Sequence, residues 1–130
     1  MNFVLASKSK IEFLNKVRNV KSVNALAQVA AIASLQDLEY LKRCVEETKK
    51  SRDLLQDYVE KSEHLSCAES HSNFVLIKTR DAQRVIKKMT DNKISIRDRS
   101  SFENLDGCIR VTVGSLETTK RIIEILQDTK

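Results

Sequence analysis

The chain has 130 residues, 41% of them hydrophobic and 32% charged, a balance typical of a globular domain and not of a disordered segment. Its net charge of +5 comes from basic residues interleaved with acidic ones, and only 5% of the residues are aromatic, which disfavours a nucleic-acid-binding surface. No apolar run reaches the roughly 18 residues of a membrane span, so we expect neither a nucleic-acid partner nor a membrane.

The opening residues lack the pattern of a secretion signal, and the three cysteines, Cys44, Cys67 and Cys108, are too scattered for a disulfide framework. We therefore expect reduced thiols and a cytoplasmic location. Proline is absent and glycine occurs only at positions 107 and 114, so long uninterrupted elements are predicted, most of them helices.

The first half of the sequence predicts three helices. Ser7 is expected to cap a helix over about 8–18 with its hydroxyl, after a short extended apolar stretch at 3–6. A second helix over about 24–35 is apolar on every side, which favours burial against more than one neighbour. A long helix follows over 36–63, with apolar residues at steps of three and four and a length of about 40 Å.

The second half changes period and predicts strands at 65–68, 73–78, 94–97 and 108–113, with helices at 81–91 and 116–128. This order is that of an α+β fold with an antiparallel sheet of the β-α-β-β-α type. We expect three parts: a helical segment over 1–35, the long helix over 36–63 and an α+β small domain over 64–130. The long helix is expected to pack its apolar side on the following sheet; a dimeric coiled coil is the alternative.

Several segments in this order resemble the histidinol-phosphate aminotransferases, which belong to the fold-type I enzymes that use pyridoxal phosphate. The segments are FVLASKSKIEFLNKVR, NALAQVAAIASLQDLEYL, SNFVLIK, ISIRD and IRVTVGSLETTKRIIEIL. Together they cover nearly the whole chain. The resemblance implies that this chain is the C-terminal small domain of such an enzyme, which moves an amino group between a phosphate-bearing amino alcohol and a 2-oxo acid.

The resemblance also implies roles for three residues. Arg110, in the R-V-T-V-G text, matches the family arginine that holds the substrate carboxylate, and a guanidinium can do so with two parallel hydrogen bonds. Arg97, in the I-R-D text, matches an arginine for the second anionic group, and Asn24 lies near the wall of the active site. From the residues alone, either arginine could instead form a surface ion pair with Asp98 or Glu103.

The cofactor lysine of the family, the aspartate that pairs with the pyridine nitrogen and the phosphate-binding residues are expected upstream of this segment. We therefore expect no catalytic or cofactor-binding residue here, and no transaminase activity from this segment alone. We expect a homo-oligomer that forms through the apolar N-terminal helices. The alternative function is a non-enzymatic module, derived from the same fold, that associates with itself or with a partner.

A metal site at His64, Cys67 and His71 is disfavoured, because a local fourth ligand is missing. A cysteine nucleophile at Cys67 is disfavoured for a similar reason, because no third group accompanies the nearby histidine.

Overall fold

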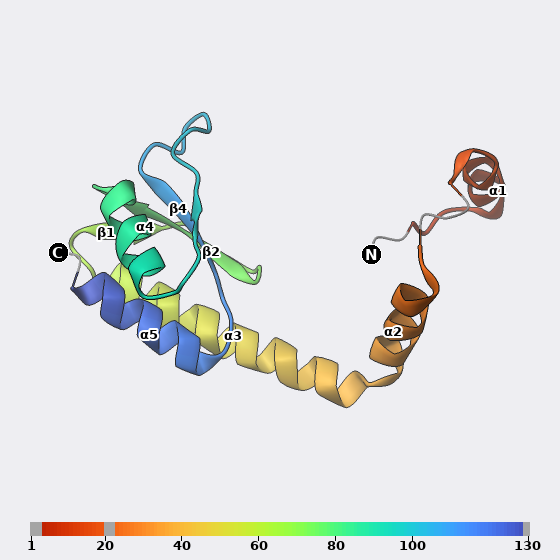
Figure 1. The fold of residues 1–130 in the computed structure, drawn as a ribbon, viewed down its shortest axis with the longest axis horizontal. Helices are drawn as coiled ribbons and strands as arrows, with labels where there is room; N and C mark the ends of the chain where they lie inside the picture. Colours follow the sequence, from red (N-terminus) through yellow and green to blue (C-terminus); the bar gives the residue numbers. More distant parts are fainter. Residues whose placement is uncertain (1–3, 20–22, 129–130) are drawn as a thin grey trace. The chain divides into compact units, whose positions relative to one another are not determined.

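The computed structural model of the chain describes residues 4–19 and 23–128, and it divides into two compact units, Met1–Lys42 and Arg43–Lys130. The order of elements is α1, α2, α3, β1, β2, α4, β3, β4 and α5 (Figure 1). Within these described residues, five helices and a four-stranded antiparallel sheet form an α+β arrangement, which confirms the predicted fold class.

The N-terminal unit contains α1 (Lys8–Val17) and α2 (Ala25–Gln36), both within two residues of their predicted bounds. Asn24 caps α2, because its side chain accepts a hydrogen bond from the N–H of Ala27 at 2.8 Å. Ser7 precedes α1 but makes no side-chain cap, contrary to expectation; its hydroxyl lies 3.4 Å from that of Ser9 instead. Of the predicted extended stretch, Phe3 lies outside the described residues and 4–6 form no strand.

The long helix α3 (Leu38–Glu60) is shorter than predicted at both ends. Its start is set by Asp37, where α2 ends and whose carboxylate accepts a hydrogen bond from the N–H of Tyr40 at 3.0 Å. A side chain that binds the backbone in this way favours a helix start over continuation of the preceding helix. Gln36 therefore belongs to α2.

The sheet has the strand order β1-β2-β4-β3, with every neighbouring pair antiparallel. Its strands are β1 (Leu65–Cys67), β2 (Phe74–Thr79), β4 (Cys108–Thr112) and β3 (Arg97–Asp98). The strand predicted at 94–97 is thus restricted to its last residue and the next one. The N–H of Ile94 donates to the carbonyl of Met89 at 2.8 Å, so this residue closes the preceding helix and does not join the sheet.

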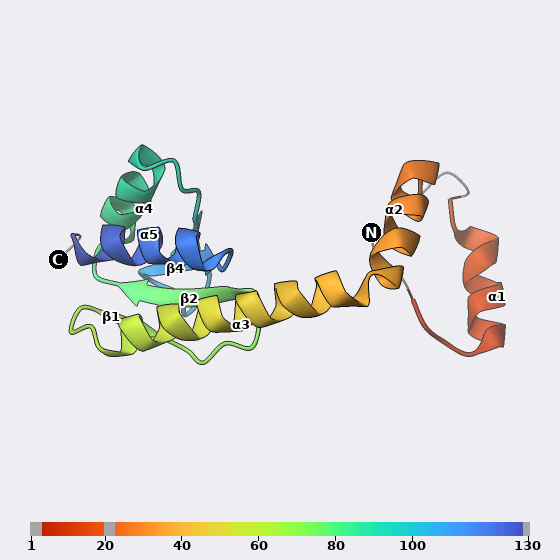
Figure 2. The same ribbon diagram turned by 90° about the horizontal axis from the view of Figure 1, so that it is seen from below.

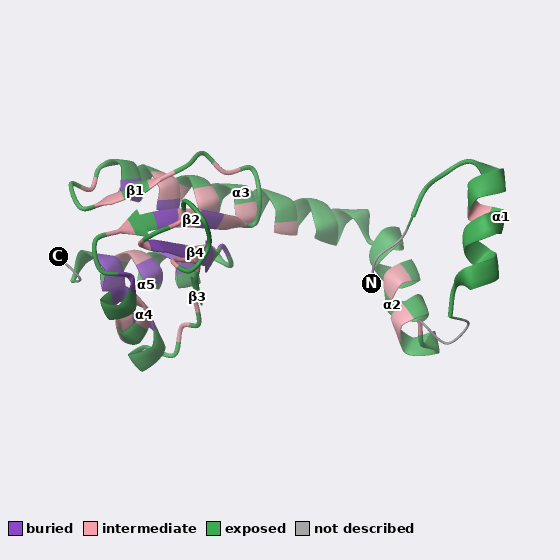
Figure 3. Ribbon diagram, turned by 90° about the horizontal axis from the view of Figure 1, so that it is seen from above, coloured by how far each residue is buried: buried purple, intermediate pink, exposed green. Residues whose placement is uncertain are grey.

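The core of the C-terminal unit lies between one face of the sheet and three helices. Val75, Ile77, Ile109 and Val111 alternate along the two central strands and are fully buried (Figure 3). Burial of one such side chain contributes about 1.5–3 kcal/mol. The helices that cover them are α4 (Ala82–Asp91), α5 (Leu116–Gln127) and the second half of α3.

The apolar side of α3 contributes to this core only in the C-terminal half of the helix. Leu55 and Val59 are completely buried, whereas Leu38, Leu41 and Val45 remain exposed. Figures 1 and 2 both show α5 running beside the second half of α3. Glu47 joins the two helices, since its carboxylate accepts a hydrogen bond from the N–H of Leu116 at 3.4 Å. The prediction that the apolar side of the long helix packs on the sheet is therefore correct for the C-terminal half of α3.

Candidate anion-binding site

The face of the sheet opposite the helices carries the side chains that alternate with the buried ones along the central strands. In β2 the alternation that buries Val75 and Ile77 places Phe74 and Leu76 on this second face. In β4 the same alternation places Arg110 there, between the buried residues Ile109 and Val111. All helix residues of the core cluster lie on the other side, so this face is the open side of the sheet.

Arg97 and Arg110 are direct cross-strand partners on the open face. Two like charges in this position repel each other and destabilise the sheet by a few tenths to about 1 kcal/mol. Neither arginine forms an ion pair with any residue that the structure describes. The pair therefore presents two guanidinium groups without a bound carboxylate, an arrangement suited to an anion with two or more oxygens.

Phe74 supports the guanidinium of Arg110, whose central carbon lies 4.8 Å from the centre of the ring. This is a cation–π contact, and it limits the directions in which the guanidinium can point. The Nε atom of Arg110 is buried and has no hydrogen-bond acceptor. A buried donor without an acceptor costs about 1–3 kcal/mol, and an anion whose oxygen reached this N–H would remove that cost.

Asp98 follows Arg97 in β3 and was one of the two carboxylates expected as possible ion-pair partners. Its Oδ1 atom accepts the N–H of Ser100 at 2.8 Å, and its Oδ2 atom accepts Nε2 of Gln83 at 2.7 Å. The hydrogen bond from the Ser100 backbone, followed by the side-chain bonds, lowers the pKa of this carboxyl. The Asp98 carboxylate therefore binds the following loop and α4, and it forms no ion pair with either arginine.

Asn24, the third predicted site residue, lies in the N-terminal unit. Its side-chain oxygen holds the first turn of α2, as described above. The structure thus brings Arg97 and Arg110 together and assigns Asn24 a capping function. Its predicted place near an active-site wall stays a prediction.

Phe74, which contacts Arg110, and Gln83, which binds Asp98, are not predicted from the sequence as functional residues. Phe74 is part of the SNFVLIK segment, where the sequence predicts that its apolar side chain belongs to the hydrophobic core. Only the strand pairing shows that it lies under Arg110, because Leu76 pairs with Arg110 and Phe74 is two positions away on the same face. No sequence signal connects Gln83 with Asp98.

The other candidate centres do not assemble. In the described part of the chain, no three histidine, cysteine, aspartate or glutamate side chains are grouped to hold a metal ion. Burial, together with the charge of Glu60, raises the pKa of the Cys67 thiol, which keeps it protonated and a poor nucleophile.

Pyridoxal phosphate requires a lysine in an enclosed site for its Schiff base. Every lysine that the structure describes is exposed except Lys88, which is half-buried and donates to the backbone carbonyl of Asp128. The described residues therefore do not fit this cofactor.

Comparison with known proteins identifies the family. The family model "Aminotransferase class I and II" matches residues 1–126. The chain belongs to the class I and II aminotransferases. This confirms the resemblance seen in the sequence.

Similar curated proteins are histidinol-phosphate aminotransferases. The one from Methanocaldococcus jannaschii is 30% identical over 98% of this chain and 35% of its own length. The one from Caldicellulosiruptor saccharolyticus is 36% identical over 97% of this chain and 36% of its own length. The chain thus spans about a third of the aminotransferases it matches.

Solved structures share the fold over the same part. Histidinol-phosphate aminotransferase from Sinorhizobium meliloti, in complex with pyridoxal-5'-phosphate, superposes with a TM-score of 0.79 at 25% identity, over 93% of this chain and 34% of that one. L-threonine-O-3-phosphate decarboxylase from Porphyromonas gingivalis gives a TM-score of 0.79 at 21% identity, over 95% of this chain and 39% of that one.

None of the described helices is long and apolar enough to cross a membrane.

Proposed function

We propose that this chain is the small domain that closes over the active site of a pyridoxal-phosphate-dependent aminotransferase of the histidinol-phosphate type. The observation that supports this most directly is the cross-strand pair of Arg97 and Arg110, on the open face of the sheet and without ion-pair partners. The two residues stand at the positions where the resemblance implies arginines that bind substrate.

In this proposal Arg110 binds the carboxylate of the amino-acid or 2-oxo-acid substrate, and Arg97 binds a second anionic group such as a phosphate. Phe74 restricts the directions in which the guanidinium of Arg110 can point. The Nε–H of Arg110, which has no acceptor within the chain, supplies one of the hydrogen bonds. Closure of the domain excludes water, which strengthens these charge-assisted bonds. Asn24 would lie near the wall of the same site.

Pyridoxal phosphate would be held by the part of the family fold that this chain does not span, because no described lysine here is suitably enclosed. The cofactor supplies the electron sink for the transfer of the amino group. The segment contributes substrate binding and no catalytic residue, so it should be inactive as a transaminase by itself.

The arginine pair can be tested on the chain as it stands, by NMR of the arginine Nε–H groups during titration with inorganic phosphate and with succinate. We expect saturable shifts of the Arg110 and Arg97 signals, with dissociation constants on the order of 1–10 mM for an incomplete site. Arg121 is a matched control, because its guanidinium lies on α5 and already donates to the carbonyl of Asn92. Shifts of equal size at all three arginines would contradict a specific site.

A second candidate function is a module that associates through its N-terminal helices, either with itself or with a partner. The observation that favours it is the exposure of apolar side chains on α2, where Leu26 is 83% exposed and Leu35 is 73% exposed. Unpartnered surface of this kind promotes association. If the chain sediments as a monomer at 100 μM and at lower concentrations, self-association through these helices is excluded.

A further inference from the structure

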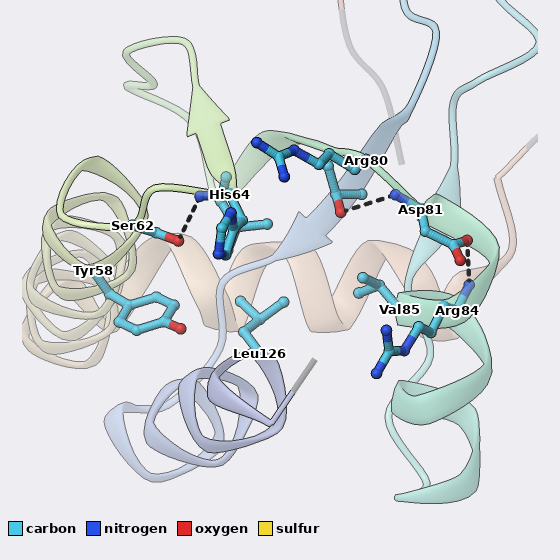
Figure 4. A pocket seen from close by; sticks show the side chains of 10 residues that line it. Tyr58, Ser62, His64, Arg80, Asp81, Arg84, Val85 and Leu126 are labelled. Atoms are coloured by element: carbon cyan, nitrogen blue, oxygen red, sulfur yellow. Dashed lines mark hydrogen bonds between the residues drawn. The ribbon is translucent and has the colours of Figure 1, made fainter. Parts of the chain in front are cut away.

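A cavity of about 220 Å³ lies in the C-terminal unit at the ends of several elements. It is enclosed by the C-terminal turns of α3 and α5, the start of α4 and the neighbouring ends of β1 and β2 (Figure 4). Thr79 lines it and shares its face of the sheet with Val75 and Ile77, so the cavity is on the helix-covered side. Arg97 and Arg110 belong to the opposite face.

The inner wall of the cavity is apolar. Val85 and Leu126, which are 2% and 3% exposed, belong to the buried core, and Leu65 packs against it. Tyr58 completes this wall with its ring (Figure 4). Burial raises the pKa of the Tyr58 phenol, so the hydroxyl stays protonated and can donate a hydrogen bond. Such a wall favours a flat or compact apolar group.

The rim of the cavity is cationic. Arg80, Arg84 and His64 line it together with one carboxylate, that of Asp81. Asp81 is already engaged, since its Oδ1 atom accepts the N–H of Arg84 at 3.0 Å and so caps α4. Two guanidinium groups facing one carboxylate leave an excess of positive charge even when His64 is neutral.

The two guanidinium groups of the rim are not neutralised by the protein. Within 4–19 and 23–128, neither Arg80 nor Arg84 forms an ion pair. In Figure 4 the side chains of Arg84, His64 and Tyr58 turn toward the cavity, whereas Arg80 extends above it. Donors and positive charge thus converge at the mouth of an apolar hollow.

We propose that this cavity binds a small organic acid, with an apolar body about the size of a benzene ring and one carboxylate. The apolar body lies against Val85, Leu126 and the ring of Tyr58, and the carboxylate accepts hydrogen bonds from Arg84 and the Tyr58 hydroxyl. This site is separate from the arginine pair on the open face and does not depend on the function proposed above.

Phenylacetate is a suitable probe, with its neutral amide as the control for charge. The chain has no tryptophan and two tyrosines, so in a Tyr40→Phe background the emission of Tyr58 alone reports on the cavity. We expect a saturable change in this emission, with half-saturation on the order of 1 mM for so small a ligand. Phenylacetamide should bind about tenfold more weakly, because it cannot form the charge-assisted bonds.

Arg84→Gln in the same background should weaken phenylacetate binding about tenfold. Lys120→Gln removes the same charge from an exposed position that does not line the cavity, and should leave binding unchanged. If Arg84→Gln alters the far-ultraviolet circular dichroism, phenylacetate binding is measured in Arg80→Gln instead. In that variant we expect a smaller loss of affinity. No saturable change up to 50 mM (about fifty times the expected constant) would overturn the proposal. So would equal binding of the amide, or a loss in Arg97→Gln as large as that in Arg84→Gln.

Discussion

The open face of the sheet places two arginines side by side at a cost to the fold. The register that pairs Arg97 with Arg110 is fixed by the buried residues on the other face, because a slip by one residue would expose Ile109 and Val111. The repulsion between the two guanidinium groups follows from that register. An anion bound by both guanidinium groups would relieve this repulsion.

Substitution of Arg97 by glutamine should stabilise the free chain, because it removes the repulsion and disturbs no hydrogen bond or ion pair shown in the structure. We expect the free energy of unfolding at 10 mM NaCl to rise by roughly 0.2–1 kcal/mol, as measured by urea denaturation. The gain should shrink at 0.5 M NaCl, where exposed charges are screened.

Lys120→Gln is the control for the general effect of net charge, since Lys120 is exposed on α5. A similar gain in this variant would show that the stabilisation comes from the overall charge of +5 and not from the arginine pair. A loss of stability in Arg97→Gln would contradict the claim that repulsion between the two arginines destabilises the free chain.

At the scale of elements, local signals placed the helices well and one of the strands poorly. The apolar periodicity placed α1 and α2 within two residues of their bounds, although the predicted cap Ser7 forms no side-chain bond to the backbone. The alternation in ISIR predicts a strand, yet only Arg97 of this text belongs to β3. Ile94 and Ile96 are half-buried and pack against the core, so packing and not strand pairing explains their spacing.

The turn before β4 depends on Gly107, whose φ of +69° lies in the left-handed region. A Cβ atom at this position would come within 2.5 Å of the carbonyl oxygen of Thr79. Gly107→Ala should therefore destabilise the chain by about 1–3 kcal/mol, as measured by the free energy of unfolding in urea.

Gly114→Ala is the matched control for this substitution. Nothing lies within 4 Å of a Cβ atom at Gly114, and its backbone is not left-handed. We expect no loss of stability, and up to about 1 kcal/mol of gain because alanine restricts the unfolded chain. Equal losses in the two variants would mean that the conformation at Gly107 is not the cause.

At the scale of the whole molecule, the two units differ in how well they bury their apolar residues. The C-terminal unit has a closed core, whereas no described residue of α1 or α2 is buried in the N-terminal unit. An apolar helix such as α2 gains little by folding while its apolar side chains remain exposed to water. This is the reason to propose a larger protein, or a partner, that covers it.

A chimera can test the proposed function as a whole. In it, this chain replaces the matching segment of the Methanocaldococcus jannaschii histidinol-phosphate aminotransferase, to which it is 30% identical. We expect measurable transamination of histidinol phosphate. Arg110→Ala should lower kcat/KM by about 100-fold, since loss of one partner of a buried charge pair costs on the order of 2–5 kcal/mol.

Absorbance of bound pyridoxal phosphate reports on assembly of the chimera independently of its activity. A chimera that binds the cofactor but shows the same kcat/KM with and without Arg110 would contradict the role of this arginine. Lys120→Gln serves again as a variant outside the proposed site, and should leave kcat/KM unchanged.

The sequence by itself determined the local elements, the α+β class and the family, because these depend on periodicity, caps and ordered motifs within short stretches. It also singled out Arg97 and Arg110 through the resemblance. Only the tertiary structure decided that these arginines face each other, that Phe74 lies beneath one of them and that Asp98 is bound elsewhere. Such contacts join residues far apart in the chain. The alternation of buried residues fixes which face of the sheet a side chain is on, but which residues of two strands meet depends on how the folded strands pair.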